Sequence, residues 1–432
     1  MSESILPADR PFAQSPVLNK VDGWAKQTLL SLLRRVQSGE IFLQDGEEQH
    51  VFGRRTEECN LHASLFVLHP RFYTQVLLGG SIGAGEAYMA GHWSSDDLTV
   101  LLRIILLNQS VFAGLDRGLS RLKAPLYKAY HFLHKDSRKG SRINIAAHYD
   151  LGNDFYALFL DETLTYSCAI FERPESSLQE ASVAKYDRIC KKLQLSPKDH
   201  VLEIGTGWGG FSIHAARCYG CRVTTTTISR AQYDLAKERI RSAGVQDKVH
   251  LLLKDYRDLK GRFDKLVSIE MIEAVGHHYL NTFFRCCSNL LTERGVMALQ
   301  AITIADHAFE RHKKEVDFIK RYIFPGSCIP SVAAMGDAVA TATDLRLVHL
   351  EDITPHYART LRTWRERFFE NIGQVRALGY SETFIRMWEF YLCYCEAGFQ
   401  ERYLGDVQML LAKPLWRGEP LLPPHPEPSP SG

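Results

Sequence analysis

The chain has 432 residues, of which 45% are hydrophobic and 24% are charged, an ordinary globular composition that excludes a largely disordered chain. Its 52 lysines and arginines are balanced by 50 aspartates and glutamates, and a net charge of +2 is too small for nucleic-acid binding by bulk electrostatics. The longest apolar run, residues 98–115, is interrupted by Arg103, Asn108 and Gln109, which argues against a membrane-spanning helix.

The first part of the chain is expected to form an arm and a smaller N-terminal domain. Residues 1–20 contain three prolines and little periodicity, which predicts a loose arm. Residues 21–134 are predicted to form a domain associated with lipid or membrane, and four glycines within residues 78–85 predict a flexible turn in it. Apolar spacing predicts two helices, over 24–36 and 98–108, and three short strands, over 41–43, 50–52 and 63–68.

A basic and aromatic stretch follows. Residues 117–142 hold eight lysines and arginines and the single acid Asp136, interleaved with tyrosine and phenylalanine. The pattern fits attraction to an anionic bilayer surface, and it fits a solvated linker equally well. We place the linker itself at residues 135–142.

Residues 143–413 are predicted to form one α/β domain, followed by a disordered tail at 414–432 that contains seven prolines. The predicted strands cover residues 200–205, 222–227, 249–254, 264–270, 296–303, 345–353 and 407–413. Helices at 208–218 and 231–243 alternate with the first of these strands, which predicts a parallel, doubly wound sheet. Two longer helical stretches, 360–377 and 382–403, separate the last two strands.

A glycine-rich turn between the first strand of this domain and the following helix is the strongest local signal. Its residues are Glu203, Ile204, Gly205, Gly207, Trp208 and Gly209. Glycine lets the backbone approach a ligand closely, and the free N–H groups at the start of the helix can bind that ligand.

Three interpretations fit a turn of this kind: a dinucleotide site, an S-adenosylmethionine site and a plain structural turn. A dinucleotide favours the spacing GxGxxG and an acid at the end of the second strand. Here the spacing is GxGxG, and the second strand ends in three threonines at 225–227. S-adenosylmethionine fits better, because Glu203 precedes the glycines and Asp255 follows the third strand. We therefore predict an S-adenosylmethionine site.

Five ordered segments carry a wider resemblance: 147–156, 160–171, 205–210, 273–276 and 322–331. Together they resemble the cyclopropane-fatty-acyl-phospholipid synthase family and the related mycolic acid cyclopropane synthases. The resemblance implies the Rossmann-like sheet of class I methyltransferases with helical insertions. It also implies methyl transfer from S-adenosylmethionine to a cis double bond of an acyl chain.

The same resemblance implies which residues contact S-adenosylmethionine besides the glycine-rich turn. These are Tyr166, Ser167, Thr227, Ile228, Ser229, Gln232, Tyr256 and Arg257. The first two belong to a Tyr-Ser-Cys motif, and the last two match the side of the site that faces adenine.

Methyl transfer to an alkene leaves a carbocation, so the site must remove a proton and exclude water. The resemblance implies that a bound bicarbonate acts as the base. The residues implied to hold it or to lie beside it are Cys168, Glu273, the backbone of Ile302, Tyr357, Gln300 and the nearby thiol Cys395. Gln300 departs from the family, which has a histidine there, because an amide donates a hydrogen bond but carries no charge.

Each of these assignments has a structural alternative. Cys168 fits a small buried hydrophobic residue, and Glu273 fits a helix cap or an arginine partner. Tyr357 and Cys395 fit ordinary core positions. Function is favoured for Glu273 because it follows the fourth strand, at the sheet edge where ligands bind. The ten cysteines show no zinc spacing, so we expect reduced thiols and no metal.

The sequence as a whole predicts a cytosolic enzyme, peripheral to the inner membrane surface, that cyclopropanates unsaturated acyl chains of phospholipids. The start of the chain lacks the basic and apolar pattern of a secretory signal. A phospholipid bilayer is the expected partner, nucleic acid is not, and a homodimer is left open. Gln300 keeps a methyl or methylene fatty-acyl synthase open. More remote alternatives are a small-molecule N-methyltransferase and a non-catalytic lipid-binding protein.

Overall fold

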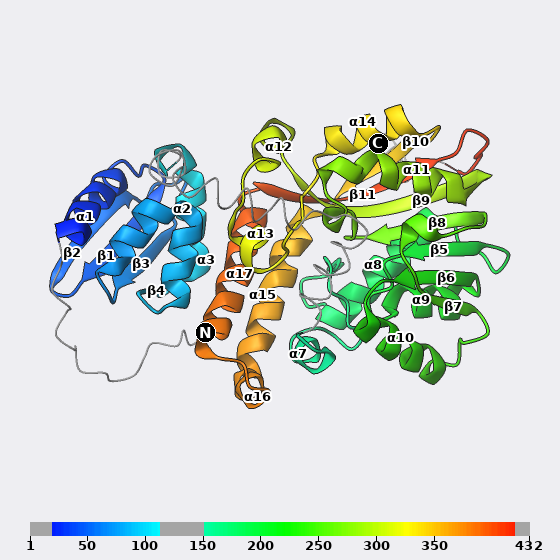
Figure 1. The fold of residues 1–432 in the computed structure, drawn as a ribbon, viewed down its shortest axis with the longest axis horizontal. Coiled ribbons are helices and arrows are strands. Elements are labelled where there is room, and N and C mark those ends of the chain that lie inside the picture. The colour runs from blue at the N-terminus through cyan, green and yellow to red at the C-terminus, as the bar shows by residue number, and fades with distance from the viewer. Residues whose placement is uncertain (1–19, 113–150, 420–432) are drawn as a thin grey trace, which may run out of the picture.

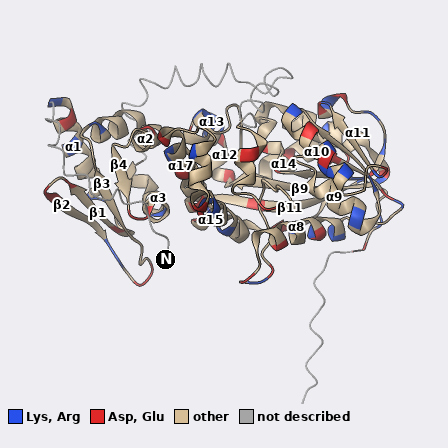
Figure 2. Ribbon diagram, turned by 90° about the horizontal axis from the view of Figure 1, so that it is seen from below, with Lys and Arg blue, Asp and Glu red and all other residues tan. Residues whose placement is uncertain are grey.

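The computed structural model describes residues 20–112 and 151–419. The predicted linker, the basic stretch 117–142, and most of the predicted arm and tail lie outside the described residues, so the domain boundaries stay predictions. Within the described ranges, no helix is both long and apolar enough to cross a membrane. Basic and acidic residues are interspersed along the helices (Figure 2).

Residues 20–112, called the N-terminal unit below, form a four-stranded sheet of order β2-β1-β3-β4 that packs against three helices. The elements are α1 (Lys20–Leu33), β1 (Gly39–Asp45), β2 (Glu48–Arg54), β3 (His62–Val67), α2 (Arg71–Met89), β4 (Trp93–Ser95) and α3 (Leu98–Leu107). Strands β1 and β3 are parallel, and the other pairs are antiparallel. Ile41 and Leu43 of β1 are fully buried, as alternation predicts for a strand with one covered face.

The glycine-rich segment 78–85 is helical, so the predicted flexible turn is wrong. Helix α2 runs through it with one kink at Gly80, whose φ of 57° and ψ of −138° are accessible only to glycine. A Cβ atom on Gly85 would lie 2.4 Å from the ring of Phe318. Gly85 therefore allows close packing between α2 and the rest of the chain, and Gly80 allows the kink.

Residues 151–419, the C-terminal unit, contain a seven-stranded sheet of order β10-β11-β9-β8-β5-β6-β7. The strands are β5 (His200–Ile204), β6 (Arg222–Thr227), β7 (Val249–Leu253), β8 (Phe263–Ile269), β9 (Leu291–Ile304), β10 (Arg346–Asp352) and β11 (Leu404–Ala412). All run in one direction except β11, which is antiparallel to both of its neighbours. This topology confirms the predicted Rossmann-like α/β fold.

Helices cover both faces of this sheet. The helices of this unit outside the insertion described below are α7 (Asn153–Ala157), α8 (Leu178–Lys192), α9 (Gly210–His214), α10 (Arg230–Ser242), α11 (Leu280–Leu290), α12 (Asp306–His312), α13 (Phe318–Tyr322) and α14 (Val332–Ala342), with a π-helix at Ala215–Tyr219 and short 3₁₀ turns at Tyr256–Asp258, Ile272–Ala274 and His277–Tyr279. In β5, Leu202 packs in one core with α11, whereas Val201 packs in the opposite core with α8. Burial of successive residues on opposite faces is expected for a parallel strand between two helical layers.

Three helices inserted between β10 and β11 stand between the two units (Figure 1). They are α15 (Thr354–Glu370), α16 (Ile372–Ala377) and α17 (Glu382–Gln400). The helix predicted over 360–377 is interrupted at Asn371, whose side-chain amide donates to the carbonyl of Leu158 at 2.9 Å. Tyr88 of α2 donates a hydrogen bond to Glu389 of α17 at 2.7 Å, which fastens the N-terminal unit to this insertion.

Candidate active site

A cavity of about 580 Å³ lies at the carboxyl edge of the seven-stranded sheet, where it is lined by the ends of β5, β6, β8 and β9. Ligands bind at this edge in open α/β sheets. The predicted site residues that line it are Tyr166, Ser167, Glu203, Ile204, Gly205, Gly207, Trp208, Thr227, Ile228, Gln232, Tyr256, Arg257, Glu273, Ile302, Tyr357 and Cys395. Four others, Cys168, Gly209, Ser229 and Gln300, are not part of its lining.

The glycine-rich turn has the backbone shape that a close ligand requires. Gly205, Gly207 and Gly209 have φ values of 102°, 52° and 87°. The N–H groups of Gly205 and Thr206 donate to the carbonyl of Thr226 at 3.0 and 3.1 Å, which holds the turn against β6. A Cβ atom on Gly207 would meet open space, so the backbone here is accessible from the cavity. The turn therefore fits S-adenosylmethionine.

Substitution of Gly205 by alanine is expected to weaken S-adenosylmethionine binding roughly 5- to 150-fold, because such backbone strain costs about 1–3 kcal/mol. The added Cβ would also lie 3.4 Å from Met271. Calorimetric titration with the cofactor measures the effect. Gly244→Ala is the matched control, since Gly244 has a φ of 70° but lies outside the cavity lining, and it should leave affinity unchanged.

Glu203 fastens the base of the turn. It is only 3% exposed, and one of its oxygens accepts hydrogen bonds from Thr225 at 2.6 Å and from Ser212. Burial raises the pKa of Glu203 to about 7, against the opposing effect of these two donors. The side chain thus ties β5 to β6 and to α9 while it lines the cavity.

The loops after β6 and β7 line the cavity beside the glycine-rich turn, and this half, which fits the cofactor, is called the cofactor half below. Thr227 donates to the side-chain oxygen of Gln232 at 2.8 Å. Ser229 caps α10, because its hydroxyl accepts from the N–H of Gln232 at 3.3 Å, so its role in the structure is to fix this loop. Arg257 contacts both oxygens of Asp255, at 2.8 and 2.7 Å.

The Tyr-Ser-Cys segment links the two halves of the cavity. The hydroxyl of Tyr166 lies 2.8 Å from that of Tyr391 on α17. Ser167 accepts a hydrogen bond from the fully buried Lys185 at 2.6 Å. Burial lowers the pKa of Lys185, although nearby carboxylates, Glu270 first among them, oppose this effect. The segment is thereby held at both ends.

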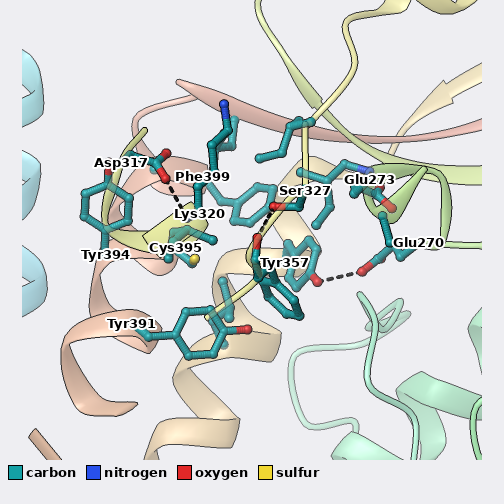
Figure 3. A pocket seen from close by; sticks show the side chains of 18 of the residues that line it. Glu270, Glu273, Asp317, Lys320, Ser327, Tyr357, Tyr391, Tyr394, Cys395 and Phe399 are labelled. Atoms are coloured by element: carbon teal, nitrogen blue, oxygen red, sulfur yellow. Dashed lines mark hydrogen bonds between the residues drawn. The ribbon is translucent and has the colours of Figure 1, made fainter. Parts of the chain in front are cut away.

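Glu270 accepts three hydrogen bonds in the second half of the cavity, away from the glycine-rich turn. Tyr357 donates to its Oε2 at 2.6 Å, and the N–H of Cys168 and the amide of Gln300 donate to its Oε1 at 2.8 and 2.7 Å. Figure 3 shows Tyr357 and Glu270 directed toward each other at the cavity wall. Glu270 also has a φ of 47°, an uncommon and strained value for a residue other than glycine.

Glu273 lies beside Glu270 in a different environment. Its Oε1 accepts from the N–H of Ile302 at 2.6 Å, and its Oε2 has no hydrogen-bond partner among the described residues. Burial, with the charge of Glu270 as the next cause, raises the pKa of Glu273 to about 8. Glu273 is therefore mainly protonated at neutral pH and is a poor proton acceptor there, whereas Glu270 is surrounded by three hydrogen-bond donors. Environments that separate two neighbouring carboxyl groups in this way assign them different roles.

The donor groups that the resemblance assigns to bicarbonate are engaged by carboxyl groups of the chain itself. Three of them contact Glu270, and the N–H of Ile302 contacts Glu273. The thiol of Cys168 donates to the carbonyl of Ala169 at 3.2 Å, and burial raises its pKa, so it stays neutral. The described residues therefore do not offer bicarbonate the implied set of free donors.

Aromatic side chains of α15 and α17 form the remaining wall. The ring of Tyr357 stacks on that of Phe399 with centroids 4.3 Å apart. Cys395 lies between the Glu270 end of the cavity and Tyr394, and burial raises the pKa of its thiol (Figure 3). This end of the cavity is suited to hydrocarbon.

Sequence reasoning missed Glu270, Lys185 and Asp406. Asp406 is fully buried on β11, 3.3 Å from the amide of Gln300, and burial raises its pKa. One signal was available for Glu270, which follows β8 at the carboxyl edge three residues before Glu273. No pattern in the sequence marks Lys185 or Asp406, since their importance comes from burial beside the cluster.

The sheet with its reversed β11, the glycine-rich turn and the cavity at the carboxyl edge define a class I S-adenosylmethionine-dependent methyltransferase. The chain belongs to the mycolic acid cyclopropane synthetase family, whose model matches residues 136–409. This confirms the resemblance found in the sequence and the assignment as an enzyme.

Individual relatives agree with this placement. The chain is 42% identical over 359 residues to the tuberculostearic acid methyltransferase UfaA1 of Mycobacterium tuberculosis, which covers 81% of this chain and 83% of that protein. It is 36% identical over 350 residues to the cyclopropane-fatty-acyl-phospholipid synthase of Escherichia coli K12, with 80% and 86% covered. The structure of mycolic acid cyclopropane synthase CmaA1 complexed with SAH and CTAB matches with a TM-score of 0.59 and 33% identity, over 63% of this chain and 98% of that one.

Proposed function

We propose that the enzyme transfers the methyl carbon of S-adenosylmethionine to a cis double bond in an acyl chain of a phospholipid. The observation that carries the proposal is Glu270, a carboxylate held by three donors at the wall of an apolar, aromatic cavity that reaches the cofactor turn. When bound, the cofactor supplies an electrophilic methyl carbon. A carboxylate beside hydrocarbon suits proton removal from a lipid cation.

The bonds that form and break in this reaction require a group that accepts a proton. The π electrons of the alkene form a new bond to the methyl carbon as the sulfur–methyl bond breaks, which leaves a cation on the neighbouring alkene carbon. Loss of a proton from the added methyl group releases a C–H electron pair that closes the ring. We infer that an Oε atom of Glu270 accepts this proton, in the role that the resemblance gave to bicarbonate. Tyr357 and Gln300 orient the carboxylate for it.

The aromatic wall protects the cation. A desolvated aromatic face stabilises a cation by on the order of 2 kcal/mol, and exclusion of water prevents its capture as an alcohol. Tyr391 and Phe399 supply such faces beside the cavity, and both are buried. An amine substrate would instead require polar partners, which makes a small-molecule N-methyltransferase the poorer fit.

A second candidate product is a methylene-branched chain or a methyl-branched alkene, formed when a hydride shift moves the cation before it loses the proton. A saturated methyl branch would need a further reductant. Two observations favour it: Gln300 in place of the family histidine, and a relative at 42% identity that is named a tuberculostearic acid methyltransferase and not a cyclopropane synthase. Proton removal by Glu270 serves either outcome, because both begin with the same attack.

A bilayer is the proposed partner, because unsaturated phospholipid chains reside there. We expect peripheral contact with an anionic surface through the basic stretch 117–142. Binding to anionic vesicles should therefore weaken as salt is added, and charge reversal at Arg138 and Lys139 should weaken it further.

The proposal is tested with purified protein, methyl-labelled S-adenosylmethionine and vesicles of unsaturated phospholipid. Label is expected in the acyl chains, and upfield ring protons in the NMR spectrum of the product separate a cyclopropane from a methylene group. Label in an amine headgroup would favour N-methylation instead. Cofactor binding without label in any acyl chain would refute the proposal.

A further inference from the structure

The cavity does not end at the active site. From Tyr391 and Cys395 it continues past Phe390 and Tyr394 of α17 and reaches side chains of α1, α2, α3, β1, β3 and β4. Tyr394 lies on the far side of Cys395 from Glu270 (Figure 3), and α3 lies beside α17 (Figure 1). The part of the cavity lined by the N-terminal unit is called the N-terminal chamber below. The family match begins at residue 136, so it does not include this chamber.

Helix α3 has more apolar surface than the core of its own unit uses. Leu98, Leu101 and Ile104 are buried in that core. Leu102 and Ile105, on another side of the helix, are only half-buried and line the chamber. A helix that is apolar on more than one side needs a second apolar partner. The chamber is where that partner would lie.

Small residues of α2 keep the chamber connected to the active site. Gly80, Ser81 and Ala84 line it, while Gly85 allows α2 to approach Phe318 and Phe390. The glycine-rich segment thus forms the wall where the two units meet.

The two ends of the cavity differ in charge. Apart from Glu270 and Glu273 of the active site, the charged residues that line it outside the cofactor half come from the segment around α12 and α13, among them Arg311, Asp317 and Lys320. The described lining of the chamber is apolar apart from Ser81 and Gln109. A buried carboxylate or phosphate without polar partners is strongly disfavoured, so only hydrocarbon suits the chamber.

We propose that the N-terminal chamber binds the methyl-terminal part of the acyl chain whose double bond lies at Glu270. This inference rests on the proposed function and deepens it: the chamber selects chains by their length beyond the double bond, and the headgroup end lies toward α12 and α13.

Substitution of Ala84 by leucine tests the selection, because the larger side chain shortens the chamber. Palmitoleoyl and oleoyl chains share the position of the double bond from the carboxyl end and differ only in length beyond it. We expect Ala84→Leu to lower the ratio of kcat/KM for oleoyl over palmitoleoyl lipid about 10-fold or more, as misfitted methylenes do in apolar pockets. Ala90→Leu is the matched control, since Ala90 is an exposed residue at the end of α2 and lies outside the lining.

An unchanged ratio in a folded Ala84→Leu protein, with or without lower thermal stability, would overturn the inference. Such a result would mean that the methyl-terminal part of the acyl chain does not occupy the chamber. Failure of the wild type to methylate either lipid would count against the proposed function, so a second readout without turnover is needed.

Fluorescence quenching supplies that readout. Trp93 lines the chamber and is 3% exposed. Oleic acid analogues brominated near the methyl end are expected to quench wild-type fluorescence, and most of this quenching should vanish in Trp93→Phe. Trp416→Phe, outside the cavity lining, is the control and should retain it. Equal quenching in the wild type and in Trp93→Phe would place the methyl end elsewhere and overturn the inference.

Discussion

Replacement of Glu270 by glutamine is expected to lower kcat by about 10²- to 10⁴-fold, the usual contribution of a general base, and to leave affinity for S-adenosylmethionine unchanged. Glutamine has nearly the same size and its carbonyl still accepts the hydrogen bond from Tyr357, but an amide cannot take up a proton. Turnover of labelled cofactor and calorimetric titration on the same preparation measure the two quantities. Wild-type kcat in this variant would remove Glu270 from the reaction.

A second variant, Glu270→Gly, tests whether a dissolved anion can replace the missing carboxylate. It removes the carboxylate and also relieves the strain of a φ of 47°. The donors Tyr357, Gln300 and the N–H of Cys168 would then face a space suited to a small anion. We expect bicarbonate to restore part of the activity of this variant and to have no effect on the wild type. Loss of wild-type turnover when bicarbonate is removed would show that bicarbonate, and not Glu270, is the base.

The architecture of the C-terminal unit was predictable because its local signals agree with its tertiary structure. The β-branched residues 224–227 form a central strand, and the glycines at 205, 207 and 209 have positive φ angles as the turn requires. Alternating apolar strands and helices leave few topologies open. The reversed direction of β11 departs from the predicted parallel sheet, since no local feature of its sequence indicates direction.

The glycine-rich part of α2 shows where local reasoning fails. Four glycines in eight residues normally indicate a turn, since each costs about 1 kcal/mol in a helix relative to alanine. Tertiary packing overrides that cost at Gly85, which lies against Phe318 and Phe390, far away in the sequence, where a larger residue would collide with both rings. A short window of sequence contains no information about such long-range contacts.

The cluster around Glu270 was unpredictable for the same reason. Its three donors are 30, 87 and 102 residues away in the sequence, on β9, on α15 and in the Tyr-Ser-Cys segment. The resemblance identified the donors Tyr357, Gln300 and Cys168 but assigned them to an external anion. Only their convergence in space indicates that a side chain of the same protein takes that position.

Glu273 is expected to give the wild-type protein a marked loss of stability with rising pH. Burial raises its pKa from the ordinary 4.5 to about 8, so between these values the folded protein keeps a proton that the unfolded chain has released. Each pH unit in that interval lowers the free energy of unfolding by up to about 1.4 kcal/mol. Stability contributed by the neutral group is therefore complete at acidic pH, falls as pH rises toward 8, and levels off above it.

Glu273→Gln removes this titration and keeps the acceptor for the N–H of Ile302. In urea unfolding without cofactor, the free energy of unfolding of the variant minus that of the wild type should thus increase steadily from about pH 4.5 to about pH 8 and stay constant above that pH. Glu238→Gln, on the exposed face of α10, should show a constant difference. A constant difference for Glu273→Gln would mean that Glu273 has the same pKa in the folded protein and in the unfolded chain. Glu273 would then be able to accept the proton as well, which would contradict the assignment of that role to Glu270 alone.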